Sequence, residues 1–408
     1  MDPEVSEAQP RATAAPSAGA GANGAGAVEP LNLSPHAKKP RDMHWVLISS
    51  GGLRAGWSVL IAVIVYRLLS PILGTLAVGI YPGLENFDFT PGAALFQELV
   101  PLLAMVAAGV VVSRIERRSI LDYNLRGPRP PTRFISGLAA GFAGLSALVG
   151  ALAWGGWLHF GPIALSGAEI LKFGALWAVV FLLVGCVEEG LFRCFLQFTL
   201  TRGINFWWAL GVVGIVCIDL FLRSRGNPGI IAFIWMDTPR MLKGNSVWGV
   251  YATAFLGSVP CLLLYVKKIE GSNFWQAAWV TSTLFGFVHT TNGGENWIGI
   301  FAAAAIGFVF CVSVRVTGSA WWAIGCHAAW DWAETFFYGA ADSGLPAQGH
   351  YLTTGPAGPA LWSGGTDGPE GSVLVLGVIL LLMVALLVIY GSGKPRRPGA
   401  SNPEPVAG

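Results

Sequence analysis

Long apolar stretches, most of them close to 20 residues, follow one another along most of this chain. A helix needs about 20 apolar residues to cross the hydrocarbon core of a bilayer. The boundaries are least sharp around Arg67 and between 205 and 266. The expected fold is all-α, a polytopic transmembrane helical bundle of about ten spans. The predicted spans are 55–80, 91–113, 134–157, 170–199, 205–222, 247–266, 274–290, 296–314, 319–338 and 373–390.

The two ends of the chain lack this pattern. Residues 1–42 are rich in Ala, Gly and Pro and have no apolar core of a signal peptide. Residues 392–408 form a similar tail with basic residues. Segments of this composition cannot bury enough apolar surface to fold. We therefore expect two disordered tails that flank one membrane domain at 43–391.

Lys and Arg residues alternate between the predicted loops. They occur in the N-terminal tail and after every second span, whereas the loops 81–90, 158–169, 291–295 and 339–372 contain none. Cytoplasmic loops collect basic residues, so this alternation places both termini in the cytoplasm. The segment 223–246 is an exception, because it carries basic residues on the predicted outer side. It is either re-entrant, or the fifth and sixth spans are misplaced.

Composition narrows the class of protein. Of the 408 residues, 53% are hydrophobic and only 12% are charged, whereas soluble domains carry about 25% charged residues. The net charge of +2 gives no reason to expect nucleic acid as a partner. The six cysteines lie in apolar stretches without C-x-x-C spacing, as expected of packing residues. The tail composition and the lack of a eukaryotic sorting signal favour a bacterial inner membrane.

Charged residues inside the fourth span are the first candidate for chemistry. The stretch FLLVGCVEEGLFRCFLQF holds Glu188, Glu189 and Arg193, and an ionisable side chain at a helix centre costs roughly 2.5–3.5 kcal/mol in a membrane. Glu189 and Arg193 are four residues apart, so they share a helix face and are predicted to form an ion pair. Glu188 points elsewhere without a partner on its own helix, which suits a general base.

Two histidines in later spans are candidate partners of Glu188. His289 follows Phe285 in LFGFVHTTNGG, and His327 precedes Asp331 in WWAIGCHAAWDWAE. One carboxylate and two imidazoles would hold a zinc ion with a water as fourth ligand, or would activate water without metal. Each motif alone fits a packing histidine or a helix–helix ion pair equally well. His289 and His327 are predicted to lie at different depths in the membrane. Both can therefore reach Glu188 only if a helix tilts or breaks.

Two acids that stand alone in their spans, Glu98 and Asp219, are interpreted as structural, because nothing nearby in the sequence matches them.

In this order, EEGLFR, FGFVH and HAAWD resemble the three motifs of the CPBP family of intramembrane proteases. That family includes the type II CAAX prenyl endopeptidases and relatives in bacteriocin processing or immunity. The resemblance covers about 90–338 and implies peptide-bond hydrolysis in a cavity between helices. It implies that Glu188 and His289 activate the water, and that His327 and Asp331 stabilise the oxyanion or hold a metal. Glu189 and Arg193 would support this site.

The chain departs from the family pattern at three points. Asp331 stands where Asn is common, and an ionised carboxylate cannot donate to an oxyanion. Cys194 follows the arginine of the first motif where glycine is frequent. Residues 204–273 separate the first two motifs by more chain than usual, which predicts an inserted helical hairpin.

The function expected from these residues is endopeptidase cleavage of a membrane-associated protein or peptide within the lipid bilayer. CAAX-type processing is what the resemblance implies, and zinc is the candidate cofactor, with Glu188, His289 and His327 as its ligands. A non-catalytic scaffold or immunity protein is the alternative from another class. A proton-coupled transporter is a third, although the short echo between INFWWAL and SNFWQAAW is no convincing inverted repeat.

Overall fold

The computed structural model describes residues 47–49, 52–86, 89–227, 229–231, 247–342 and 347–391. The two tails predicted to be disordered, 1–42 and 392–408, lie outside the described residues. Most of the exceptional basic segment also lies outside them, since residues 228 and 232–246 are not described.

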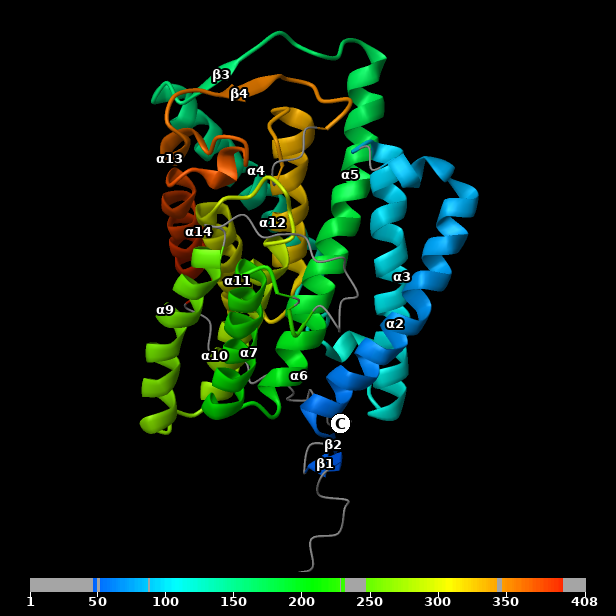
Figure 1. The fold of residues 1–408 in the computed structure, drawn as a ribbon, viewed down its shortest axis with the longest axis vertical. Helices are drawn as coiled ribbons and strands as arrows, with labels where there is room; N and C mark the ends of the chain where they lie inside the picture. Colours follow the sequence, from blue (N-terminus) through cyan, green and yellow to red (C-terminus); the bar gives the residue numbers. More distant parts are fainter. Residues whose placement is uncertain are drawn as a thin grey trace, which may run out of the picture. The chain divides into compact units, whose positions relative to one another are not determined.

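Helices make up about three quarters of the described chain (Figure 1). Every predicted span falls on a helix, and the prediction of an all-α membrane bundle is confirmed. The longer helices are α2 (Ala55–Ile80), α3 (Pro91–Ile115), α4 (Pro130–Trp154), α5 (Ala168–Glu189), α6 (Gln197–Thr201), α7 (Phe206–Ser224), α9 (Val247–Val266), α10 (Ser272–His289), α11 (Trp297–Thr317), α12 (Trp321–Trp332) and α14 (Leu374–Tyr390).

Seven helical segments in the described part are long and apolar enough to cross a membrane, with α5 and α6 counted as one segment, Ala168–Thr201. Helix α14 is apolar but spans only Leu374–Tyr390. Helices α10 and α12 are shorter or more polar than that criterion requires. The chain is therefore an integral membrane protein, and the total of ten spans stays a prediction.

Short elements connect the long helices. Two of them are π-helical, η3 (Gly190–Leu196) after α5 and η4 (Ala333–Phe337) after α12. The others are the 3-10 turns η1 (Pro82–Asn86), η2 (Ile120–Asp122) and η5 (Pro369–Gly371), the helix α13 (Ala360–Ser363), and the antiparallel strand pairs β1 (Ile48–Ser49) with β2 (Gly52–Leu53) and β3 (Leu158–Phe160) with β4 (Thr354–Pro356).

Polar caps and prolines determine where several helices begin. The side chains of Thr90, Asn205 and Asn296 accept hydrogen bonds from backbone N–H groups in the first turns of α3, α7 and α11. Pro91 and Pro130 are the first residues of α3 and α4, where the missing N–H of proline costs no hydrogen bond.

Helix α12 lies against α4, α5 and α11 and is held most closely by α4. Glycines make this close approach possible. A Cβ atom on Gly141 of α4 would overlap the carbonyl oxygen of Cys326, and one on Gly325 of α12 would overlap that of Phe134. Gly137 and Gly141 form a G-x-x-x-G pair, which lets membrane helices pack backbone against backbone. The position of α12 is therefore determined by contacts between its backbone and that of α4.

Helices α7 and α9, which carry the predicted hairpin at 204–273, pack against each other and against α10. Asp219 does have a partner on its own helix. Its Oδ2 lies 2.9 Å from Nε of Arg223, and the backbone N–H of Ile231 donates to its Oδ1 at 2.6 Å. The structural role of Asp219 stays a prediction, but the expectation that nothing nearby matches it was wrong, because Arg223 lies one turn further on.

The segment after α12 folds back over one end of the helices, beside β3 (Figure 1). Polar contacts tie it to α11 and α12. Asn296 donates its backbone N–H to Asp367 Oδ2 at 3.0 Å and its side-chain amide to the carbonyl of Gly371 at 3.1 Å. Trp330 Nε1 donates to Glu370 Oε1 at 2.7 Å. The acids of this segment are therefore held beside the helices that carry the motifs.

Candidate active site

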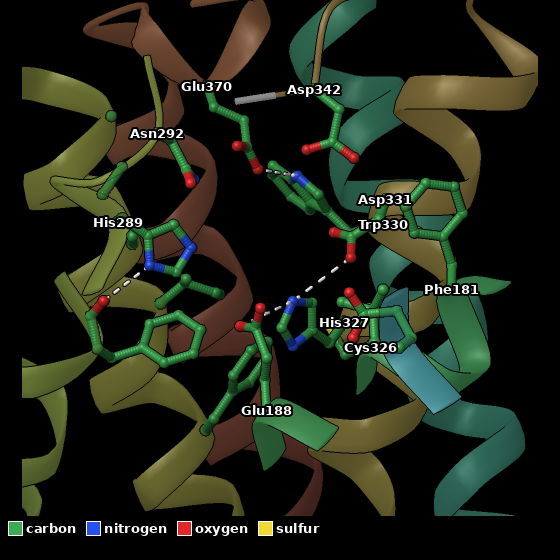
Figure 2. A pocket seen from close by; sticks show the side chains of 18 of the residues that line it. Phe181, Glu188, His289, Asn292, Cys326, His327, Trp330, Asp331, Asp342 and Glu370 are labelled. Carbon is green, nitrogen blue, oxygen red and sulfur yellow. Dashed lines mark hydrogen bonds and ion pairs between the residues drawn. The ribbon is translucent and has the colours of Figure 1, made fainter. Parts of the chain in front are cut away.

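A cavity of about 210 Å³ lies among α3, α5, α10, α11, α12 and α14 and is covered by the segment after α12. Its walls are apolar except for a group of titratable and amide side chains, several of which point into it (Figure 2). That group is Gln97, Glu98, Glu188, His289, Asn292, His327, Asp331, Asp342 and Glu370.

Glu188 and Glu189 are the last two residues of α5 before the helix widens into the π-helix η3. Glu188 lines the cavity (Figure 2), whereas Glu189 is fully buried at 0% exposure behind it. Single π turns occur often at functional sites, because they change the direction of the side chains that follow. The regular α-helical geometry thus ends immediately after the two glutamates.

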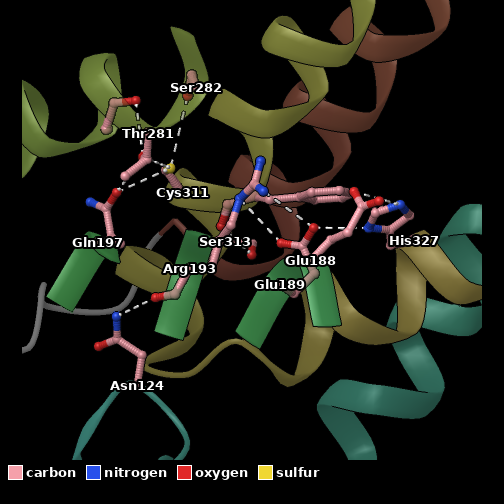
Figure 3. Close-up of polar contacts among 12 residues, drawn as sticks. Asn124, Glu188, Glu189, Arg193, Gln197, Thr281, Ser282, Cys311, Ser313 and His327 are labelled. Atoms are coloured by element: carbon pink, nitrogen blue, oxygen red, sulfur yellow. Dashed lines mark hydrogen bonds and ion pairs between the residues drawn. The ribbon is translucent and has the colours of Figure 1, made fainter. Parts of the chain in front are cut away.

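Glu189 connects the first and third motifs (Figure 3). Its Oε2 lies 3.1 Å from Nε of Arg193, so the predicted ion pair is present, and both side chains are 0% exposed. Its Oε1 lies 2.9 Å from Nδ1 of His327. The guanidinium of Arg193 also lies 4.1 Å from the ring centre of Phe285, a cation–π contact with the second motif.

His327 is oriented by these contacts. A carboxylate paired with arginine can only accept, so Nδ1 carries the hydrogen and Nε2 is the atom that faces the cavity. Nε2 lies 3.4 Å from Oδ2 of Asp331 and 3.8 Å from Oε2 of Glu188 (Figure 2). The structure therefore brings together Glu188, Glu189, Arg193, His327 and Asp331, as the motifs predicted.

His289 is the last residue of α10 and lies across the cavity from Asp331 (Figure 2). Its Nδ1 donates to the carbonyl oxygen of Phe285 at 2.7 Å, which leaves Nε2 available. No ion pair or hydrogen bond joins His289 to Glu188 among the described residues. A group that spans the cavity, such as water or a substrate, is needed to connect them.

The expected zinc ligands are not gathered around one point. Within the described ranges, no three His, Cys, Asp or Glu side chains lie close enough together to hold a metal ion. Glu189 holds Nδ1 of His327, and the Phe285 carbonyl holds Nδ1 of His289 on the opposite wall. As arranged, Glu188, His289 and His327 do not fit a zinc ion.

The position of Glu98 differs from the one that we expected from the sequence. We expected a structural residue, but Glu98 lines the cavity, and Glu188 and His327 are the charged groups that act on it electrostatically. Its neighbour Gln97 also lines the cavity. Two adjacent polar side chains in the otherwise apolar stretch AALFQELVPLL were the signal that could have identified it.

Asp342 and Glu370 were also missed, because they belong to a polar loop that follows the third motif. Their environment differs from that of a solvated loop. Burial raises the pKa of Asp342 and raises that of Glu370 to about 8, where the charge of Asp342 adds to the effect. Both side chains line the cavity at the end away from Glu188 (Figure 2).

Comparison with known proteins agrees with the motifs. Residues 170–333 match the family model described as type II CAAX prenyl endopeptidase Rce1-like. The matched range contains all three motifs, and it confirms the resemblance to the CPBP family. No curated protein and no solved structure gave a significant match to the chain. The family supports a membrane protease.

Proposed function

We propose that this chain, whose residues 170–333 match the Rce1-like type II CAAX prenyl endopeptidases, is an intramembrane endopeptidase. Its substrate would be a membrane-associated protein or peptide that enters the cavity between the helices. One observation carries the proposal. His327, held at Nδ1 by Glu189, presents Nε2 to Glu188 and Asp331 at the wall of a cavity.

Glu188 is the general base in this mechanism. Its Oε2 is buried beside His327 without a hydrogen-bond partner in the described part of the chain, while the side chain as a whole is 30% exposed and lines the cavity. A water between Glu188 and Nε2 of His289 would give its proton to Glu188. The resulting hydroxide would attack the carbonyl carbon of the scissile bond. Protonated Glu188 would then pass this proton to the nitrogen of the leaving amine.

His327 is the donor for the oxyanion. When Nε2 carries a hydrogen, it can donate to the negatively charged oxygen of the tetrahedral intermediate. The carboxylates of Glu189 and Asp331 lie 2.9 Å from Nδ1 and 3.4 Å from Nε2, and they stabilise the doubly protonated ring. Asp331 thus works through His327 and needs no hydrogen of its own, which accounts for Asp where Asn is common.

The test is the conversion of Glu188 to Gln, which keeps the shape and removes the base. We expect turnover of a prenylated CAAX peptide, by protein purified in detergent or liposomes, to fall about 10²–10⁴-fold. The amount of folded protein should not change. Glu169→Gln is the matched control, because Glu169 is an exposed carboxylate in the first turn of the same helix.

His289→Ala and His327→Ala should lose activity as Glu188→Gln does, and double variants should be no worse than single ones. Metal analysis of the same preparations decides whether zinc belongs to the site. Undiminished cleavage by Glu188→Gln would refute the mechanism and favour the non-catalytic scaffold.

A further inference from the structure

The end of the cavity away from Glu188 is acidic. Among the described residues, no Lys or Arg pairs with its carboxylates, and the basic groups that act on them electrostatically are His289 and His327. Asp342 and Glu370 point into it from the covering segment (Figure 2). Each is held by one neutral donor: Thr335 Oγ1 donates to Asp342 Oδ2 at 2.9 Å, and Trp330 Nε1 donates to Glu370 Oε1 at 2.7 Å. The remaining carboxylate oxygen of each side chain is available to a ligand.

A third carboxylate lies behind these two. Glu334 is 0% exposed, and neither of its oxygens has a hydrogen-bond partner among the described residues. Its Oε1 lies 3.4 Å from the Cβ position of Gly368, in the segment that carries Glu370. Its charged neighbours are all acidic: Glu370, Asp342, Asp331 and Asp367. A buried carboxylate without a partner is costly unless a cation or a donor reaches it.

No Lys or Arg in the part that the structure describes pairs with these carboxylates. Neither Asp342 nor Glu370 forms an ion pair there with Lys or Arg, and residues 339–372 contain neither residue type. Of the described residues that line the cavity, the basic ones are His289 and His327. A positive charge that enters the acidic end would therefore meet carboxyl oxygens whose lone pairs are unused, and it would favour the ionised form of these groups.

The spacing of these carboxylates favours an organic cation over a metal ion. No three acidic, histidine or cysteine side chains in the described ranges are close enough to share a metal ion. The cavity of about 210 Å³ accommodates a side chain. An ammonium group has three hydrogens in different directions and can bridge acceptors that are too far apart to coordinate one ion.

We propose that the acidic end binds the ammonium group of a lysine in the substrate, with Asp342 and Glu370 as specificity-determining residues. This inference rests on the proposed endopeptidase function. His327 and Glu334 are seven residues apart along α12 and η4, which is ~10 Å at ~1.5 Å per residue. An extended peptide covers this distance in about three residues. The lysine therefore lies within three residues of the scissile bond.

The first test is cleavage of matched peptides by the full-length protein in liposomes. Lys, norleucine or Glu replaces each of the three residues on either side of the bond in one prenylated peptide. At one position we expect kcat/KM to favour Lys over norleucine by about tenfold, the value of one charge-assisted hydrogen bond. The double variant Asp342→Asn/Glu370→Gln should reduce this ratio to about one, because kcat/KM should fall more for the Lys peptide than for the norleucine peptide.

Glu169→Gln is the control and should keep the full ratio, because its carboxylate is exposed outside the cavity. Equal cleavage of Lys and norleucine peptides at every position, or a preference that survives the double variant, would overturn the inference. Absence of any cleavage would count against the proposed function instead. The second test then decides the inference by itself.

The second test measures binding without catalysis. We expect n-butylammonium, which reproduces the end of a lysine side chain, to raise the thermal unfolding midpoint of Glu188→Gln protein in a saturable way. The neutral match 1-butanol should have no such effect. The shift should disappear when Asp342→Asn and Glu370→Gln are added. No shift, or a shift produced only by Ca²⁺ or Zn²⁺, would refute binding of an ammonium group.

Discussion

Two adjacent glutamates of α5 have different environments because neighbouring side chains on a helix diverge by about 100°. Glu189 is turned toward α12 and is paired with Arg193 and His327. Glu188 is turned toward the cavity and has an oxygen without a hydrogen-bond partner among the described residues. The buried Glu189 fixes the orientation of the His327 imidazole, and Glu188 needs that imidazole for catalysis. A single pair of residues thus supplies both the support and the reactive group.

Glu98 and Asp219 allow a prediction at the same scale, since both are single acids in apolar spans. Glu98→Gln should lower turnover about tenfold or more with little change in the unfolding temperature, because Glu98 lines the cavity beside Glu188. Asp219→Asn should instead lower the unfolding temperature and leave the turnover per folded molecule unchanged. It leaves Arg223 without a counter-charge, which costs about 3–5 kcal/mol of stability. Cleavage assays and thermal unfolding of both variants check this.

The two variants control each other, because the chemical change is the same and only the position differs. If Glu98→Gln lost stability but kept its turnover per folded molecule, the original structural interpretation of Glu98 would be restored.

At the scale of the elements, α12 carries His327 and Asp331, and glycines hold it against α4. A backbone–backbone contact has few ways to relax, whereas a side chain can change rotamer. The depth of His327 in the bundle is therefore set where Gly137 and Gly141 meet α12. The π-helix η4 follows α12, and its Thr335 donates to Asp342 in the segment that covers the cavity.

Gly141→Ala should therefore reduce both stability and activity. Its Cβ would overlap the carbonyl oxygen of Cys326, so α12 must move, at a cost of about 1–3 kcal/mol. Gly150→Ala, two to three turns later on α4, is the control, because no atom of another described element lies within 4 Å of its Cβ position. It should be neutral or slightly stabilising. Thermal unfolding and cleavage of a CAAX peptide by both variants provide the measurement, and equal behaviour would contradict this role of α4.

Across the whole molecule, the features that depend on local order were predictable from the sequence. Apolar length located the helices, and the spacing of four between Glu189 and Arg193 predicted their ion pair. The acidic end of the cavity was not predictable in this way. Asp342, Asp367 and Glu370 lie in a loop without periodicity, and only its return over α11 and α12 buries them. Likewise, nothing in the sequence around His289 shows that its Nδ1 is held by its own helix, at the Phe285 carbonyl.

The buried acids of this loop predict how stability depends on pH. Burial raises the pKa of Asp367 to about 8 and that of Glu370 to about 8, with neighbouring carboxylates adding to both shifts. In the unfolded chain such groups release their protons near pH 4. Between these two values the folded protein binds more protons than the unfolded chain. The contribution of these two groups to stability therefore falls as the pH rises from about 4 to 8, and levels off above that.

We expect the thermal unfolding midpoint of the purified protein to be lower at pH 9 than at pH 6. The double variant Asp367→Asn/Glu370→Gln should lose much of this difference, because amides keep the shape and have no proton to release. The loss at pH 9 should come from both positions, since Asn296 and Trp330 already hold one oxygen of each acid and the fold cannot move them into water. Glu169→Gln should keep the slope of the wild type. A midpoint that rises between pH 6 and pH 9, or a slope unchanged in the double variant, would mean that these carboxylates are ionised and solvated in the folded protein.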